Sequence, residues 1–462
     1  MKKALYELSL MQAQQLIANR DITKEDYLEG ILSRIADVEP YLHLFADFDP
    51  HVLRRDCSSL NSVSSTVQSN KPLLGIPIGV KDIIDTRQLK TQRGSRAFKG
   101  RIAPKAASVV QSIEEHGGLV LGKTVTTEFA WRSPGLTRNP WNLAHTPGGS
   151  SSGSAAGVAS RCMPAAIGTQ TLGSIIRPAA YCGVVGFKPS FGTIPRTGVY
   201  PLSPSLDHIG VFTRSVEDAA YLTSFLIKND GVDFPHHSPL PIPSPLNWSN
   251  WSDAQKNMRP PKIALLKTSK WARVSVEQQQ LIEKTALHLS QSGADVSVLD
   301  LPPSFDCIWD MADTIQFAEA AEINELLALE EPCRISSLTQ TLVKKGLNIP
   351  MLEYVKAKRK QQELIAEFTQ CLRGIDAVLT APALGEAPKG LEDTGDAVFC
   401  TPFTFLGAPA ITLPAGYSSN GLPLGIQLAN DWGSDAKLLS VAVWVEKALN
   451  KIYTPRNLEL KL

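Results

Sequence analysis

Two serines in one unusually small-residue stretch, residues 145–189, are the first candidates for chemistry. Ser150 lies in the run PGGSSSGSAA, and Ser174 ends the strand-like segment GTQTLGS. Apolar sequence flanks the stretch and little charge interrupts it, so we expect it to be buried, with main-chain N–H groups close to a ligand. A serine hydroxyl is a weak nucleophile unless a base removes its proton. The sequence must therefore also supply a base.

A lysine is the best candidate for that base. Of the eight histidines, only His145 and His208 stand in conspicuous apolar motifs. Lys81 ends the apolar run LLGIPIGVKD, and burial would lower its pKa enough to make it a neutral amine. If the strand continues, Asp82 points to the opposite face and leaves Lys81 without an adjacent carboxylate. The alternative is a lysine whose ammonium group reaches solvent at the end of a strand.

Three other patterns match known motifs but lack the neighbouring secondary structure or ligand residues that those motifs require. Residues 117–124 fit the phosphate-binding G-x-x-x-x-G-K-T pattern, but the residues between the glycines should form a strand and not a loop. Residues 149–153 fit the G-x-S-x-G nucleophile elbow, yet no strand precedes them. The pair His236-His237 lies in a Pro-rich segment without nearby Cys or Glu ligands. We expect no metal and no organic cofactor.

The elements around these residues alternate between strands and helices, which indicates an α/β fold with some parallel strands. We expect one large domain over residues 1–462. Within it we distinguish a helical arm at 1–45, a catalytic core at 73–228, a Pro-rich surface connection at 229–261 and the remainder of the same domain at 262–462. Helices are predicted at 106–115, 275–292, 349–373 and 435–448.

The charge balance and the cysteine content limit which classes of partner and which cellular compartment we expect. Lys plus Arg number 46 and Asp plus Glu 45, so no net field attracts nucleic acid or an anionic membrane. The basic run at 356–360 is expected to be a solvated helix face. Seven scattered cysteines without a C-x-x-C pair are typical of reduced thiols. With no apolar run of about 18 residues and no signal-peptide core, we expect a cytoplasmic protein.

Several segments together resemble one known family. GVKD, PGGSSSGSAA and GTQTLGSIIRPAAYCGVVGFKPS are similar to the signature of the amidase signature family of serine hydrolases. SLDHIGVFTRSVEDAA, DAVLTAP and LGAPAITLPAGYSSNGLPLGIQL look like its later blocks, so the resemblance covers most of the chain. It implies a single large α/β domain whose central mixed β-sheet is covered by helices on both faces.

The resemblance also implies a Ser-cisSer-Lys triad. Lys81 would take the proton of Ser150 while Ser150 takes that of Ser174, the nucleophile, with a cis peptide bond between Gly149 and Ser150. Ser151 would support this network. The oxyanion hole would be formed by the backbone N–H groups of four consecutive residues, Thr171, Leu172, Gly173 and Ser174.

Three positions depart from the commonest family pattern. Leu172 stands where many members have glycine, and a positive φ would strain it. Gln170 occupies a place often held by Asp. Arg177 follows Ser174 by three residues, as in the malonamidase-like branch, where an arginine at this offset holds a substrate carboxylate. Arg177 would then bind substrate, or it would tie down the loop through backbone carbonyls.

The expected activity is an amidase that cleaves a carboxamide C–N bond through an acyl-enzyme and releases ammonia or an amine. Two alternatives stay open: the glutaminase (A) subunit of a tRNA-dependent amidotransferase, and an inactive family member that only binds. Trp131, Trp141 and Phe317 would line the acyl pocket or pack in the core. The expected partner is a small-molecule amide, joined by a second copy of the chain if the N-terminal helices expose their Leu and Ile faces, with no nucleic acid and no membrane.

Overall fold

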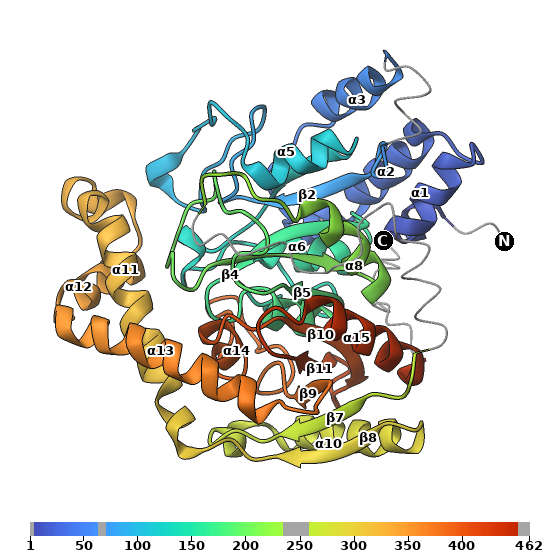
Figure 1. Cartoon of the computed structure of the whole chain (residues 1–462). Coiled ribbons are helices and arrows are strands. Elements are labelled where there is room, and N and C mark those ends of the chain that lie inside the picture. Colours follow the sequence, from blue (N-terminus) through green and yellow to red (C-terminus); the bar gives the residue numbers. More distant parts are fainter. Residues whose placement is uncertain (1–3, 63–70, 234–257, 451–462) are drawn as a thin grey trace.

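Among the described residues, eleven strands form one β-sheet with β1 at one edge and β8 at the other; in Figure 1 it extends from β2, in the upper half, to β8 at the bottom. The computed structural model describes residues 4–62, 71–233 and 258–450. In spatial order the strands are β1 (Phe45–Asp47), β3 (Leu119–Thr124), β2 (Pro77–Lys81), β4 (Ala165–Gln170), β6 (His208–Thr213), β5 (Val185–Lys188), β10 (Ala410–Tyr417), β11 (Pro423–Ala429), β9 (Ala377–Thr380), β7 (Lys262–Leu266) and β8 (Asp295–Leu299).

The sheet is mixed. β2 runs parallel to β3 and β4, and β7 runs parallel to β8 and β9, while the strands between these two groups pair antiparallel. Parallel neighbours end at the same edge of a sheet. The carboxyl ends of β2 and β4 therefore bring Lys81 and the turn after Gln170 together.

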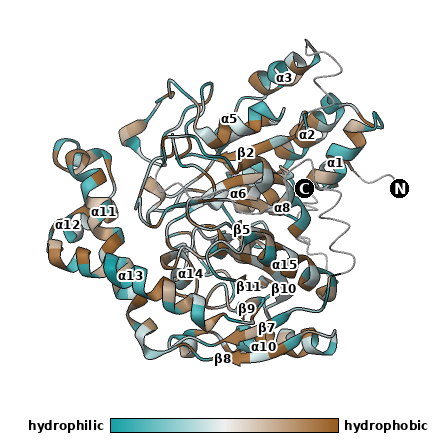
Figure 2. Cartoon of the chain, in the orientation of Figure 1, coloured by the Kyte–Doolittle hydropathy of each residue, from teal (hydrophilic) through white to brown (hydrophobic). Residues whose placement is uncertain are grey.

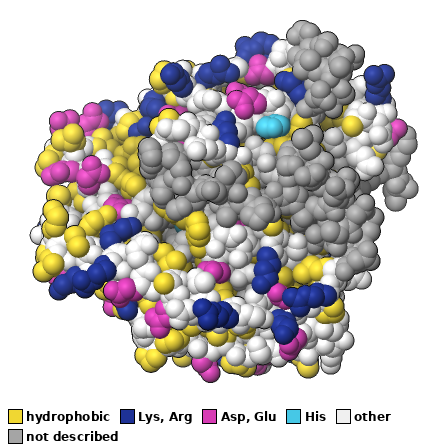
Figure 3. Space-filling view, in the orientation of Figure 1, with side chains coloured by type: hydrophobic (Ala, Val, Ile, Leu, Met, Phe, Trp, Pro, Cys, Tyr) yellow, Lys and Arg dark blue, Asp and Glu magenta, His cyan; other side chains and the backbone are white. Residues whose placement is uncertain are grey.

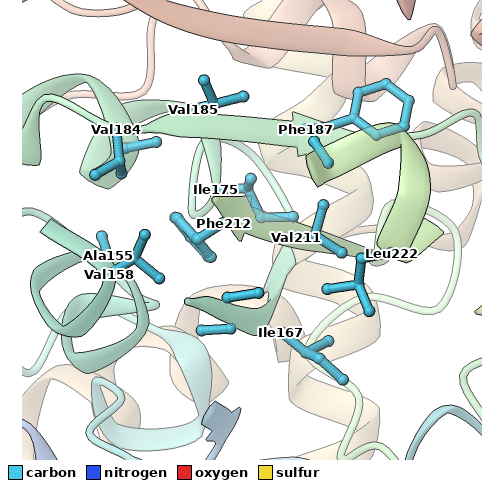
Figure 4. Packing of buried hydrophobic residues seen from close by; sticks show 14 of the residues in the cluster. Ala155, Val158, Ile167, Ile175, Val184, Val185, Phe187, Val211, Phe212 and Leu222 are labelled. Carbon is cyan, nitrogen blue, oxygen red and sulfur yellow. The ribbon is translucent and has the colours of Figure 1, made fainter. Parts of the chain in front are cut away.

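Two hydrophobic clusters cover the two faces of the sheet, as expected for this fold. Along β7, Ile263 and Leu265 belong to one cluster while Ala264 and Leu266 belong to the other, because successive side chains of a strand point to opposite faces. Figure 4 shows part of the first cluster, where side chains of β4, β5 and β6 pack with those of α6 (Ser152–Ala159) and α8 (Val216–Leu226).

The helices that pack around the sheet largely fall where the sequence predicted them. The predicted segments correspond to α5 (Ser108–Glu115), α10 (Val276–Gln291), α13 (Met351–Cys371) and α15 (Asp435–Leu449). The other α-helices among the described residues are α1 (Leu10–Ala18), α2 (Lys24–Leu42), α3 (Pro50–Ser59), α7 (Ile176–Cys182), α11 (Ile308–Glu330), α12 (Ser337–Leu347) and α14 (Thr401–Phe405). α13 carries the basic run 356–360 and is largely hydrophilic in Figure 2.

The N-terminal helices belong to the body of this chain. Ser9 caps α1 in a capping box, and Thr23 accepts a hydrogen bond from the backbone of Asp26 at the start of α2. The apolar residues of α2 are buried in the chain's own core: Leu28, Ile31, Leu32 and Ile35. The expectation that this face supports a homodimer is therefore wrong, because the face is already covered.

The phosphate-loop pattern at 117–124 is a strand, as predicted. Residues Leu119–Thr124 form β3, and the buried Nζ of Lys123 donates to the carbonyl of Ile84 and, at 2.9 Å, to Oγ1 of Thr91. His236-His237 and most of the predicted connection at 229–261 lie outside the described residues. Among the helices that are described, none has the length and hydropathy that a membrane span requires.

Candidate active site

Lys81 ends β2 and is completely buried. Its Nζ lies 2.7 Å from Oγ of Ser150 and 2.7 Å from Oγ1 of Thr169. Loss of hydration holds the pKa of Lys81 well below its usual range, and the positive charge of Arg177 lowers it further, against an opposing effect of Asp207. The lysine is thus neutral much more readily than one in water, and a neutral amine has a free electron pair that accepts a proton.

The neighbouring carboxylate of Asp82 is directed elsewhere, as strand alternation predicted. It accepts hydrogen bonds from the backbone N–H groups of Gln92, at 3.0 Å, and Gly94, at 3.3 Å. Burial raises the pKa of Asp82 to about 6. Asp82 therefore stabilises the 92–94 loop and forms no ion pair with Lys81.

Ser150 reaches Lys81 from a tightly packed loop. The peptide bond between Gly149 and Ser150 is cis. Gly148 has a φ of +80°, and a Cβ on Gly149 would lie 2.8 Å from Cγ2 of Thr394, so neither position has room for a larger residue. The carbonyl of Ser150 accepts from the backbone of Thr127 at 3.2 Å.

Ser151 is tied to the backbone of β4. Its Oγ donates to the carbonyl of Thr169 at 3.2 Å and accepts from the N–H of the same residue at 3.4 Å. This pair of contacts joins the serine loop to the strand that carries Thr169. Because its hydroxyl already makes both bonds with β4, Ser151 fits a supporting role better than that of an elbow nucleophile.

The turn from Thr171 to Ser174 follows β4 directly and is held by Gln170. Oε1 of Gln170 accepts from the backbone N–H groups of Ile175, at 2.9 Å, and Ile176, at 3.0 Å. Its Nε2 donates to Oγ1 of Thr404 at 2.9 Å. A neutral amide here supplies both an acceptor for the start of α7 and a donor to α14, which an aspartate could not do.

Leu172 is accommodated without backbone strain. It is absent from the residues with positive φ, and so is Gly173. Its carbonyl accepts from Oγ1 of Thr404 at 3.1 Å, and its side chain packs against the second hydrophobic cluster. The concern that leucine would distort this turn therefore has no basis in the backbone.

Ser174 opens onto a cavity of about 270 Å³. The residue is 8% exposed, and the residues from Thr171 to Ser174 line the cavity together with Arg177. A Cβ on Gly173 would lie 2.8 Å from Cβ of Ala397, so only glycine fits at the position before Ser174. The cavity is therefore bordered by Ser174 and by the three residues that precede it.

Arg177 ties down the serine loop and also borders the cavity. Its Nη2 donates to the carbonyl of Gly149 at 2.6 Å, which ties the helix α7 to the serine loop. The same residue lines the cavity, and its buried Nε has no hydrogen-bond partner within the described ranges. One edge of the guanidinium is thus structural, while another keeps an unused donor.

The three aromatic residues proposed for the acyl pocket lie in different surroundings. Trp131 lines the cavity and Phe317 packs edge-on against it, with ring centroids 5.9 Å apart. Trp141 is a core residue, whose Nε1 donates to the carbonyl of Cys182 at 2.8 Å. Three cavity residues of α11, Trp309, Asp313 and Gln316, were not predicted, because nothing in the sequence places that helix beside residues 171–174.

The residues that the structure describes contain no group of three or more His, Cys, Asp or Glu side chains that could hold a metal ion.

Comparisons with known proteins agree with this architecture. The family model described as Amidase matches residues 26–439. A crystal structure of an amidase superposes with a TM-score of 0.83 at 29% identity and covers 95% of this chain and 99% of that one. The native peptide amidase of Stenotrophomonas maltophilia has a TM-score of 0.82 at 26% identity, over 97% and 98% of the two chains.

Among the curated relatives are components of amidotransferases. The glutamyl-tRNA(Gln) amidotransferase (A) subunit of Prochlorococcus marinus (strain MIT 9211) is 31% identical over 96% of this chain and 97% of its own length. The protein of the same name from Halothermothrix orenii is also 31% identical, over 96% and 98%.

These relatives correct the expected set of partners. By name they are subunits of a larger enzyme, which implies protein partners, so an expectation that names no other protein as a partner is wrong. The family model covers most of the sequence, and the fold matches that of solved amidases over nearly the whole length of both chains. The chain therefore belongs to the Amidase family, the enzymes that hydrolyse amide C–N bonds.

Proposed function

We propose that the chain hydrolyses a carboxamide through a Ser-cisSer-Lys triad of Lys81, Ser150 and Ser174. The observation that carries this proposal is the 2.7 Å contact between Nζ of Lys81 and Oγ of Ser150 in a fully buried environment. A neutral lysine accepts the proton of Ser150 as Ser150 accepts that of Ser174. The relay lets a lysine that does not itself reach the cavity act as a general base.

The reaction then proceeds in two steps. Oγ of Ser174 attacks the carbonyl carbon, the C–N bond breaks, and the relayed proton leaves with the ammonia or amine. Water then attacks the ester, gives its proton back through the relay and releases the carboxylic acid. Backbone N–H groups of the turn from Thr171 to Ser174 would stabilise both oxyanions, at about 3–4 kcal/mol for a well-aligned donor.

We assign the catalytic machinery to residues 73–228, with the signature at 145–189, and the completion of the same domain to residues 262–462. The contacts of Gln170 with Thr404, and of Gly173 with Ala397, support this division because the second segment holds the nucleophile turn in place.

The test is ammonia release by the purified chain from a panel of small primary amides. Ser174→Ala, Ser150→Ala and Lys81→Met should each lose at least about 10³-fold in kcat/KM, since residues that act as one unit fail together. Ser154→Ala is the matched control, because Ser154 is another buried serine of this run, bonded to Thr124 and to the carbonyl of Ile167. Near-normal turnover in Lys81→Met would refute the triad.

The inactive-binder alternative is tested separately. A fluorophosphonate probe reacts with an activated serine, so it should label the chain and fail to label Ser174→Ala. Absence of labelling in the folded wild type would favour a protein that only binds. The relaxed backbone at Leu172 removes the reason for expecting that result.

We also propose that Arg177 holds a carboxylate of the substrate, as in the malonamidase-like branch. Its unpartnered Nε beside the cavity supports this assignment. Arg177→Lys should lose activity on acidic amides at least about tenfold more than on neutral amides, because a lysine cannot replace the planar donor edge. Equal losses on both classes would leave Arg177 only its bond to Gly149.

The relatives favour a second candidate, the glutaminase (A) subunit of a tRNA-dependent amidotransferase. Two of them are 31% identical over 96% of this chain and carry the name of that component. In that case glutamine is the amide, and the ammonia passes to a second active site. Glutamine hydrolysis that stays low for the chain alone and rises at least about tenfold with partner proteins and charged tRNA would establish it. Rapid hydrolysis by the isolated chain, unchanged by such partners, would favour the stand-alone amidase.

A further inference from the structure

Helix α11 carries a buried amide to the cavity beside the nucleophile. Gln316 is 2% exposed and lines the same cavity as Ser174. Its Oε1 is buried and has no hydrogen-bond partner in the described part of the chain. An unpaired buried acceptor destabilises a protein, and a ligand bound beside this one could supply the missing donor.

An acidic side chain lies one helical turn earlier on the same face of α11. Asp313 also lines the cavity, and residues three apart are neighbours on a helix surface. Burial raises the pKa of Asp313, while the positive charge of Arg132 opposes that effect. Two further acids line the cavity: Asp396 pairs with Arg273 at 2.6 Å, and Asp393 accepts from the backbone N–H of Gly395 at 3.0 Å. Gln316 and Asp313 thus bring an amide and a carboxylate to the same part of the cavity wall.

Arg177 provides a complementary group in the same cavity. It is 6% exposed, and its Nε is a donor without a partner within the described ranges. The cavity thus contains one unsatisfied acceptor, from Gln316, and one unsatisfied donor, from Arg177. A ligand with a single polar end would satisfy only one of the two.

We propose that Gln316 and Asp313 form a specificity subsite for an N–H donor of the substrate, an ammonium group in particular, while Arg177 takes a carboxylate. The substrate class is then a small amide that carries both an amino and a carboxylate group. This inference rests on the proposed function for the position of the reacting amide. Neither residue has a chemical role; both select the substrate.

Binding to Ser174→Ala tests the subsite without turnover. The probes are glutamine and 4-carbamoylbutanoate, which differ only in the amino group, and their Kd values are measured by calorimetry. Glutamine should bind more tightly by about tenfold or more, the factor expected for a hydrogen bond to a charged group. Gln316→Met, which keeps the length of the side chain, and Asp313→Asn should each reduce that ratio while changing the Kd of 4-carbamoylbutanoate by no more than about threefold.

The controls separate recognition from folding. Gln316→Glu keeps an acceptor and adds charge, so it should retain or increase the preference for glutamine. Asp310→Asn, an exposed position of the same helix, should change nothing. Equal Kd values for the two probes, or a parallel weakening of both in Gln316→Met, would overturn the subsite. Amide hydrolysis by Ser174→Ala would contradict the proposed function. The ratio of the two Kd values would still test the subsite, because it is measured by binding alone.

Discussion

At the scale of single residues, the site depends on a lysine kept out of water. Lys81 has no exposed surface, and loss of hydration is the largest influence on its pKa. The sequence could indicate this residue only in combination with the two serines, because buried lysines also stand near the end of β3, Lys123, and at the end of β5, Lys188. The partners of Lys81 could not be derived from spacing alone, since Ser150 and Thr169 are brought to it by other strands and loops.

Burial of Lys81 should weaken the fold at neutral pH. The folded-state pKa lies below 10.5, so the unfolded chain binds a proton that the folded chain resists, and this cost grows as the pH falls from about 10.5 towards the folded pKa. Lys81→Met removes it. The difference in Tm between Lys81→Met and wild type should therefore decrease steadily from pH 7 to pH 10, in calorimetric scans of both proteins. A difference that increases with pH would mean that the lysine is charged when folded.

The same pKa governs the rate. The neutral lysine is the active form, so kcat/KM should rise with pH and level off once Lys81 is deprotonated. Ser154→Ala is expected to keep the wild-type profile. An activity that falls as the pH rises from 6 to 8 would exclude a neutral amine as the base.

At the scale of elements, β4, its turn and α7 form one unit that α14 holds in place. Gln170 bonds both the start of α7 and Thr404, and Thr404 also donates to the carbonyl of Leu172. The sequence predicted the strand and the turn from the Gly-Ser step. It did not predict why Gln170 replaces the usual acid, because the residue that requires an amide donor, Thr404, is distant in the chain.

Gly173→Ala should disrupt this unit. The added Cβ would lie 2.8 Å from Cβ of Ala397, so the turn has to move and the backbone donors lose alignment. We expect kcat to fall by about 10²-fold or more, the effect of losing one oxyanion donor. The double variant Gly173→Ala with Ala397→Gly removes the clashing methyl and should recover part of the loss. If kcat did not recover, the loss would be due to the second close contact of the added Cβ, 3.1 Å from Cβ of Cys400.

Helix α11 shows where prediction from sequence failed. Its residues Ile308, Ala312 and Ile315 are buried, whereas Leu326 and Leu329 are largely exposed. Apolar residues on several sides of a helix blur the 3.6-residue period that would reveal it. On the substrate side of the cavity the sequence offered Trp131, which does line it, but it did not predict Asp313 and Gln316 of α11.

At the scale of the whole molecule, the chain is one α/β body with a helical projection. The sequence predicted the single sheet, because the strands after residue 260 extend it and do not form a second one. It did not predict that α11, α12 and α13 would group together at the left of Figure 1. Figure 3 shows hydrophobic side chains over this region, and the exposed ones include Leu326, Met351 and Leu352.

The N-terminal arm should be fastened to the body by one carboxylate. Asp218 of α8 accepts from the backbone N–H groups of Leu10, at 3.3 Å, and Met11, at 3.0 Å, at the start of α1. Asp218→Ala leaves these donors unpaired and should lower the free energy of unfolding by about 2 kcal/mol in urea titrations. Limited proteolysis near residue 20 should accelerate, while Glu217→Ala, a half-buried neighbour on the same helix, should change neither quantity. Unchanged proteolysis of Asp218→Ala would show that packing alone holds the arm.

The identity of the acylated residue is the most direct test of the mechanism. A primary amide or a chromogenic anilide is mixed with the chain, and the reaction is quenched in acid during turnover. The residue that carries the acyl group is then identified by peptide mass spectrometry. The account predicts one acyl group on Ser174, absent in Ser174→Ala. An acyl group on Ser150 or Ser151, or full turnover with no acylated serine, would contradict it.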